Sequence, residues 1–207
     1  MQLDTIKKRR GRPPKSGRDT TNTKTELISS GVEHFTQFGF ASSGLEQILK
    51  KVSVPKGSFY HYFANKEVFG LAVIDYYNSY FSRKLDSHLK NDQLAPEQRL
   101  LSFVEDAKAG IERYNFNRGC LVGNLEQEIA VLPDSHREKL AMVMRGWQRK
   151  ISDHLKVLYP DTEQEERHLL AEFFWIGWEG AVSRCKLVQT TQPIDLFINH
   201  YLLLLKK

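Results

Sequence analysis

The chain has 207 residues, of which 41% are hydrophobic and 27% charged, a balance typical of a folded globular protein rather than a disordered one. Its longest apolar runs, at residues 173–178 and 201–205, fall far short of the roughly 20 residues that cross a bilayer. The amino terminus also lacks the apolar stretch of a secretory signal, so we expect a cytoplasmic protein without a membrane span.

The positive charge is concentrated at the amino terminus. The formal net charge is +5, yet residues 1–24 alone carry eight basic and two acidic residues. Because residues 1–22 combine this charge with proline, glycine and almost no apolar residue, we expect a flexible basic arm. Its sequence RGRP is similar to an AT-hook core, in which Arg10 and Arg12 would lie in the minor groove of A·T-rich DNA. The alternative is a solvated tail that only adds non-specific affinity for DNA.

The first predicted helix covers residues 23–38. Its apolar residues recur at helical spacing, and Gly39 is expected directly after the last turn, where a glycine commonly ends a helix. The residues predicted to face the core are Leu27, Ile28, Val32, Phe35 and Phe38. Ser43 and Glu46 then form a capping-box pattern, which predicts a second, short helix at residues 43–51.

A third short helix follows a tight turn at residues 52–54. Pro55 is expected at its first position, where a missing amide proton has no cost, and the helix ends near residue 63. Two short helices joined in this way form either an ordinary helical hairpin or a helix-turn-helix, whose second helix enters the DNA major groove. The residues predicted on its outward side are Lys56, Gly57, Ser58, Tyr60 and His61.

A long helix at residues 67–89 is predicted to connect the first three helices to the rest of the chain. Asn65 is expected to cap it. Lys66 lies in its first turn, where a cation opposes the helix dipole and therefore favours an external anion such as a phosphate.

Five further helices are predicted from apolar stripes, at residues 96–114, 120–131, 134–158, 163–188 and 193–205. Because strand signals are absent, the predicted fold class is all-α. Two glycines inside the fourth of these helices, Gly177 and Gly180, indicate close helix packing or space for a ligand. The last two helices are apolar enough to favour a partner subunit.

Residues 23–69 resemble the DNA-binding domain of the TetR family of bacterial regulators. The resemblance rests on Gly39-Phe40, the helix at residues 45–49, the string KGSFYHYF at residues 56–63 and Asn65-Lys66-Glu67. It implies a homodimer that binds double-stranded operator DNA without a cofactor and represses transcription until a small effector binds. It also implies that residues 23–69 form a three-helix helix-turn-helix domain and residues 70–207 a helical effector-binding and dimerisation domain.

The same resemblance implies roles for single residues. Ser43 and Lys66 would hold phosphates of the DNA backbone. This sequence departs from the family at Pro55, where many members have a serine or threonine whose hydroxyl can touch a phosphate. The residues that would face the bases are Lys56, Gly57, Ser58, Tyr60 and His61.

Two more strings, RGCLVGNLEQE at residues 118–128 and FWIGWEGAVSRCKL at residues 174–187, resemble a subgroup of this family that responds to acrylate. More distantly, they resemble family members that sense reactive electrophiles. A buried site for a carboxylate needs a cation or several hydrogen-bond donors, and Arg184 and Lys186 are the candidates in these strings. Trp178 would form a wall of the same cavity, or is simply a core residue.

Cys120 directly follows Gly119 at a predicted helix start, beside Arg118. The helix dipole and the arginine are expected to lower the pKa of its thiol and make it an electrophile sensor. The alternative is that Cys120 is a small core residue. Cys120 and Cys185 lack the spacing of a metal site, and a disulfide between them in the cytoplasm would be a regulated event.

Two other classes of function remain as alternatives. In an enzyme, Glu126, Glu128, His136 and Glu179 would be the acid and base groups, yet no common nucleotide-binding, hydrolase or metalloprotease motif is present. A DNA-binding protein without an effector would leave the large apolar carboxy-terminal part unexplained. We therefore predict a regulator with no catalytic residue and no metal.

Overall fold

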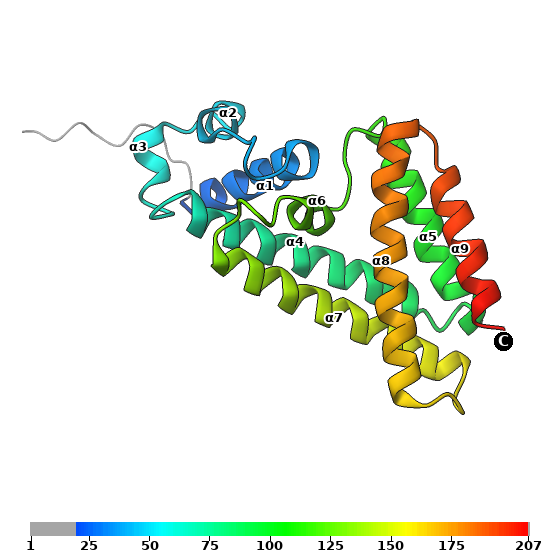
Figure 1. The fold of residues 1–207 in the computed structure, drawn as a ribbon. Coiled ribbons are helices and arrows are strands. Elements are labelled where there is room, and N and C mark those ends of the chain that lie inside the picture. The colour runs from blue at the N-terminus through cyan, green and yellow to red at the C-terminus, as the bar shows by residue number, and fades with distance from the viewer. Residues whose placement is uncertain (1–19, 207) are drawn as a thin grey trace, which may run out of the picture.

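The structure is a computed structural model, and it describes residues 20–206. Over that range the chain folds into nine α-helices with no strand, which confirms the all-α prediction (Figure 1). Within the same range, no helix is long and apolar enough to cross a membrane. The helices are α1 (Thr20–Phe38), α2 (Leu45–Lys51), α3 (Lys56–Phe59), α4 (Lys66–Leu89), α5 (Pro96–Arg113), α6 (Leu121–Gln127), α7 (Asp134–Leu158), α8 (Gln164–Val188) and α9 (Gln192–Leu204).

The sequence predicted each of these helices, and its errors lie at their ends. The capping box at Ser43 does not form, because α2 begins at Leu45 and the Ser43 hydroxyl donates instead to the carbonyl of Gly39, 2.5 Å away. Pro55 is the N-cap of α3 rather than its first helical residue. Helix α3 ends at Phe59 rather than near residue 63, and α6 has only seven residues and ends at Gln127, also earlier than predicted.

Helices α1, α2 and α3 pack around a small core that also takes a residue from α4. The ring of Phe69 in α4 is fully buried and lies 6.0 Å from that of Phe35 in α1 and 5.4 Å from that of Phe59 in α3. Because the first turn of α4 is part of this core, α4 and the three preceding helices are expected to move as one body.

Helix α1 ends at Phe38, and Gly39 follows it as predicted, with a φ of +77° that favours glycine. The chain turns there so that Phe40 enters the core, where its ring lies 5.4 Å from that of Phe35 and 4.7 Å from that of His136. Phe38, which was predicted to face the core, is 49% exposed, because the turn directs the next aromatic residue inward instead.

Helix α4 continues into the carboxy-terminal part, where it lies against α5 and α7 (Figure 1). Buried aromatic rings form the centre of this part. The ring of Trp147 in α7 lies 4.4 Å from that of Phe81 in α4 and 5.2 Å from that of Trp175 in α8. A single helix, α4, therefore contributes side chains to both cores.

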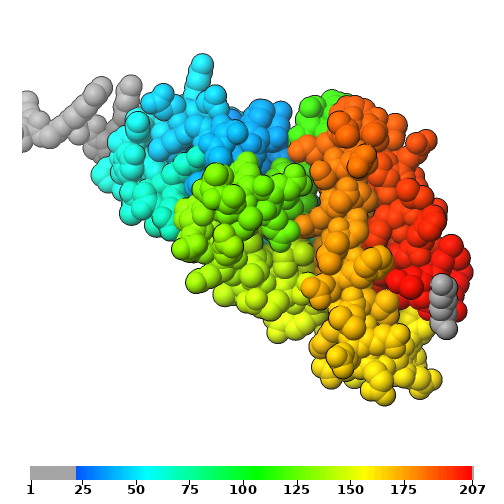
Figure 2. All heavy atoms as spheres, viewed as in Figure 1, coloured from blue at the N-terminus to red at the C-terminus, as the bar shows by residue number. Residues whose placement is uncertain are grey.

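Helices α8 and α9 pack closely against each other. Gly177 permits this contact, since a Cβ atom there would overlap the ring of Phe197 in α9. Both helices nevertheless carry a line of exposed apolar side chains, and Figure 2 shows α8 uncovered along its length on the near face. These exposed residues are Leu169, Phe173, Ile176 and Leu187 in α8, and Leu196 and Leu203 in α9.

Candidate DNA-binding and effector sites

Helix α3 presents a polar outer side and is anchored by aromatic rings beneath it. Phe59 and Phe63 are buried, and their ring centroids lie 5.4 Å apart. Gly57 faces open space, since a Cβ atom there would meet nothing within 4 Å. Of the predicted DNA-facing residues, Ser58 is half-buried, and the exposed ones are Lys56, Gly57, Tyr60 and His61. The helix therefore offers donors and an aromatic ring to an external partner.

Ser43 and Lys66, the predicted phosphate ligands, are engaged inside the protein. Ser43 is fully buried, and its hydroxyl is bound to Gly39. The ammonium of Lys66 donates to the carbonyl of Phe40 at 2.6 Å and lies 4.3 Å from the centroid of its ring. Burial lowers the pKa of Lys66. Both side chains thus stabilise the turn between α1 and α2, and their phosphate contacts stay predictions.

The other predicted DNA contacts, Arg10 and Arg12 in the basic arm, lie outside the residues that the structure describes.

Helix α6 holds the turn between α1 and α2. The Glu128 carboxylate, at the carboxy-terminal end of α6, accepts hydrogen bonds from the amides of Phe40 and Ala41, each 2.9 Å long. The side chain of Asn124 donates to the carbonyl of Thr36 at 2.7 Å. These bonds connect α6 to the part of the chain that positions α2 and α3.

An ion pair links the segment before α6 to α1. Nη2 of Arg118 lies 2.9 Å from Oε2 of Glu33, which also pairs with Lys51 at the end of α2. The guanidinium carbon of Arg118 lies 4.1 Å from the centroid of the Tyr114 ring. Burial alone would raise the pKa of Glu33, but the bonds from Lys51 and Arg118 outweigh it and lower that pKa.

An apolar cavity of about 260 Å³ lies between α1, α4, α5, α8 and the segment that begins α6. Its walls include Tyr77, Phe81, Ile111 and Trp178, and Cys120 also lines it. Volume and lining suit one small organic molecule with an apolar part. Trp178 and Cys120, two of the predicted effector residues, thus line the same cavity.

The thiol of Cys120 differs from the prediction. Burial raises its pKa to about 12, and the carboxyl group of Glu179, whose Oε1 lies 3.9 Å from the sulfur, adds to the effect. The amides of Val122 and Gly123 at the start of α6 act in the opposite direction but do not compensate for the lost water. The predicted lowering of this pKa is therefore wrong, because burial favours the neutral thiol.

The two cations predicted for the effector site do not line this cavity. Arg184 is exposed and lines a different hollow, and the aliphatic part of Lys186 lies beside Gly119. Among the described lining residues, the cations are Lys84 and Arg118. Sequence reasoning missed Lys84 as a residue of this cavity, although its spacing from Tyr77 and Phe81 places all three on one face of α4.

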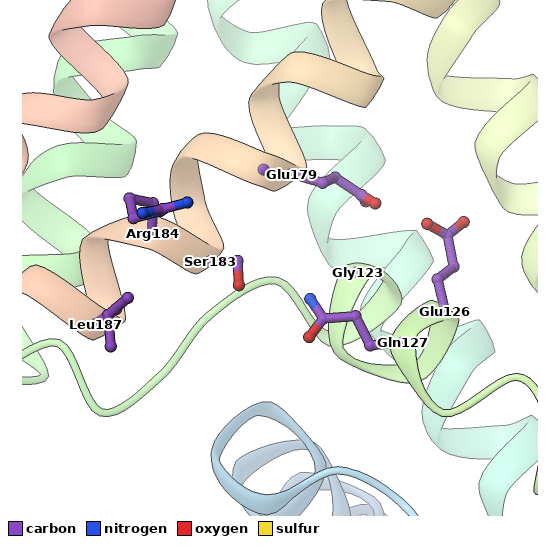
Figure 3. Close-up of a pocket in the computed structure, with 8 residues that line it drawn as sticks. Gly123, Glu126, Gln127, Glu179, Ser183, Arg184 and Leu187 are labelled. Carbon is purple, nitrogen blue, oxygen red and sulfur yellow. The ribbon is translucent and has the colours of Figure 1, made fainter.

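A second hollow, of about 550 Å³, lies between α6 and α8 (Figure 3). In Figure 3 the carboxyl groups of Glu126 and Glu179 point toward each other across it, with Ser183 and Arg184 further along α8. Burial, and then the neighbouring Glu126, raise the pKa of Glu179 to about 9. At neutral pH Glu179 therefore keeps its proton.

Comparison with known proteins identifies both halves of the chain. A family model described as bacterial regulatory proteins of the tetR family matches residues 27–73, and one described as a tetracyclin repressor-like C-terminal domain matches residues 96–201. The transcriptional regulator AcuR of Cereibacter sphaeroides is 46% identical over 92% of this chain and 88% of its own length. The transcriptional repressor NemR of Escherichia coli strain K12 is 27% identical over 86% of this chain and 92% of its own.

Among solved structures, the regulatory protein TetR from Rhodobacter sphaeroides superposes with a TM-score of 0.80 and is 44% identical. The superposition covers 86% of this chain and 95% of that one. The arrangement of helices and the sequence thus match the same group of proteins.

Glu179→Gln is expected to stabilise the fold at pH 8 but not at pH 4. The folded pKa of Glu179, about 9, lies above its ordinary value of 4.5, so the unfolded chain loses this proton first and stability falls as the pH rises between these values. Glutamine mimics the protonated form and removes that loss, a gain of about 1–3 kcal/mol at pH 8. Urea unfolding at both pH values measures it. The exposed Glu172→Gln on the same helix is the control, and equal gains in both variants would contradict the prediction.

Proposed function

Because the chain belongs to the TetR family of transcriptional regulators, we propose that it is a repressor that binds operator DNA as a homodimer and is released by a small effector. The helix-turn-helix domain would comprise residues 23–69, and the effector would occupy the cavity beside Cys120 and Trp178 in the remainder of the chain. The family and its relatives are regulators, and the chain is not an enzyme.

The observation that carries this proposal is that one short segment, residues 118–128, serves both sites. It lines the cavity through Arg118 and Cys120. It also holds the turn between α1 and α2 through Glu128. A ligand in the cavity would therefore touch the segment that positions the DNA-binding domain, which is the connection that an effector-controlled repressor needs.

Lys56→Ala and Tyr60→Ala should each weaken specific operator binding by about tenfold or more, because contacts to base edges and phosphates are typically worth 1–3 kcal/mol. Both side chains are exposed, so the thermal unfolding temperature should stay unchanged. Fluorescence anisotropy with a labelled operator measures the affinity. Lys156→Ala, an exposed lysine at the far end of α7, is the matched control. Equal losses of operator affinity for Lys56→Ala and Lys156→Ala would argue against α3 as the recognition helix.

A second copy of the chain is the proposed cover for the exposed apolar residues of α8 and α9. Such uncovered stripes are rare on monomers, and most homo-oligomers are two-fold dimers. A dimer would present two copies of α3, and the two half-sites should lie about one helical turn of DNA, roughly 34 Å, apart.

Ile176→Glu should break this dimer, because it places a charge on a side chain that is 67% exposed in one subunit and would be buried between two. We expect a dimer mass for the wild type and a monomer mass for the variant in sedimentation experiments at micromolar concentration. Met142→Glu on α7, where the side chain is 57% exposed, should leave the dimer intact. A monomeric wild type would refute the proposal.

The proposed effector is acrylate or a related small carboxylate or electrophile, in line with the resemblance of residues 118–128 and 174–187. The alternative is a covalent electrophile sensor that acts through Cys120. The raised pKa of that thiol favours reversible binding, since the thiolate is the nucleophile and burial disfavours it.

Acrylate should therefore release the protein from its operator, and dialysis should restore binding. Cys120→Ser should respond to acrylate nearly as the wild type does, because it removes the nucleophile at almost constant volume. Operator binding before and after dialysis, together with the intact mass of the protein, tests both statements. A permanent mass increase on Cys120, with loss of the response in Cys120→Ser, would establish covalent sensing instead.

A further inference from the structure

The cavity beside Cys120 has an electrostatic preference of its own. Its walls are largely apolar and aromatic, and its two described cationic side chains are Lys84 and Arg118, with no carboxylate among the described lining residues. An anion with a small apolar part matches such a lining better than a cation does, because the low dielectric of apolar walls strengthens the attraction of a buried charge pair.

The two cations form ion pairs with carboxylates in different parts of the chain. Nζ of Lys84 lies 2.8 Å from Oδ2 of Asp106 in α5, so this pair lies entirely within the carboxy-terminal part. Arg118 instead binds Glu33 in α1, at 2.9 Å. Arg118 thus lines the cavity and also forms an ion pair with the DNA-binding domain.

The Glu33 carboxylate is itself shared within the DNA-binding domain. It accepts from Arg118 and from Lys51, the last residue of α2, and so joins α1, α2 and the segment before α6. The guanidinium of Arg118 is held over the ring of Tyr114, another residue that lines the cavity. The guanidinium thus lies between Glu33 and the cavity, where a bound ligand could offer it a second carboxylate while the contact with Tyr114 is kept.

We propose that Arg118 recognises an anionic effector and gives up Glu33 when it does so, so that the ligand carboxylate and Glu33 compete for one guanidinium. This inference rests on the proposed function and adds the residue that holds the anion and the contact through which the signal passes. Loss of the Arg118–Glu33 pair leaves the bond from the Gly119 amide to the carbonyl of Thr36, 3.2 Å long, as the connection of this segment to α1. The weaker connection changes the position of α1 and α2, and the change in operator affinity follows from it. By linkage, operator binding weakens anion binding to the same extent.

The test uses acrylate and its neutral isostere acrylamide as probes, with calorimetry for their binding and fluorescence anisotropy for the operator. Arg118→Gln should bind acrylate at least about tenfold more weakly than the wild type, with little change for acrylamide. Glu33→Gln, which lacks the competing charge, should bind acrylate several-fold more tightly. Its operator affinity should also change less on saturation with acrylate than that of the wild type.

Lys84→Gln is the matched control, since it removes the other cation of the cavity and leaves the Arg118–Glu33 ion pair unchanged. It should bind acrylate more weakly, yet at saturation the ratio of operator affinities with and without acrylate should equal that of the wild type. Arg118→Lys keeps the charge but not the planar guanidinium, and its acrylate affinity should lie between those of Arg118→Gln and the wild type. This intermediate affinity would show that the effect of Arg118→Gln is not a folding defect.

Wild-type acrylate affinity in Arg118→Gln, or a full operator response with unchanged acrylate affinity in Glu33→Gln, would overturn the inference. So would a wild type that binds its operator but not acrylate, although that result leaves the proposed DNA-binding function standing. A wild type that binds acrylate but no operator would instead overturn the proposed function, while the calorimetry still decides whether Arg118 holds the anion.

Discussion

The relation between the two domains depends on two hydrogen bonds, which the amides of Phe40 and Ala41 donate to the Glu128 carboxylate. The Phe40 bond is partly buried, and leaving such an amide unpaired costs on the order of 1–3 kcal/mol, so the carboxylate stabilises the turn mainly through this bond. The fit also explains Gly39 beyond its positive φ, because a Cβ atom there would overlap the Glu128 carboxylate. Gly39 thus permits both the positive φ of the turn and the close approach of Glu128.

The DNA-binding domain is attached to the rest of the chain by two kinds of contact. Helix α4 supplies Phe69 to its core, and aromatic packing of this kind has a strong distance dependence, so α4 follows the domain as a rigid element. Helix α6 and the segment before it supply hydrogen bonds and the Arg118–Glu33 ion pair. Polar partners can be exchanged for a ligand at little net cost. The structure therefore combines a fixed connection with an exchangeable one.

The sequence predicted the periodic parts of this structure and missed what depends on distant partners. Apolar spacing, together with capping and proline signals for the two short helices α2 and α3, was sufficient for all nine described helices. It was also sufficient for the exposed side chains in and directly after α3, at Lys56, Gly57 and Tyr60. The capping box predicted at Ser43 does not form, because the Ser43 hydroxyl donates to the carbonyl of Gly39 in the turn after α1. The lowered pKa predicted for Cys120 was wrong, because the residues around a helix start do not reveal how deeply the thiol is buried. Arg118 was noticed only as a nearby charge, since Glu33 lies 85 residues away in the chain.

The size of the proposed effector limits how far the two states of the regulator can differ in free energy. Acrylate has five non-hydrogen atoms, and at a ceiling of about 1.5 kcal/mol per atom its total binding free energy cannot exceed roughly 7–8 kcal/mol. A change from 1:99 to 99:1 between two conformations requires about 5.5 kcal/mol of difference in affinity. Most of the ligand's binding free energy must therefore distinguish the two states, and the unliganded protein must lie close to balance between them. Rearranging an aromatic core such as that around Phe69 would exceed this limit, whereas exchanging one carboxylate for another on a single arginine does not. A small effector is thus compatible with this fold only if it acts on the polar contacts between α1 and the segment that leads into α6.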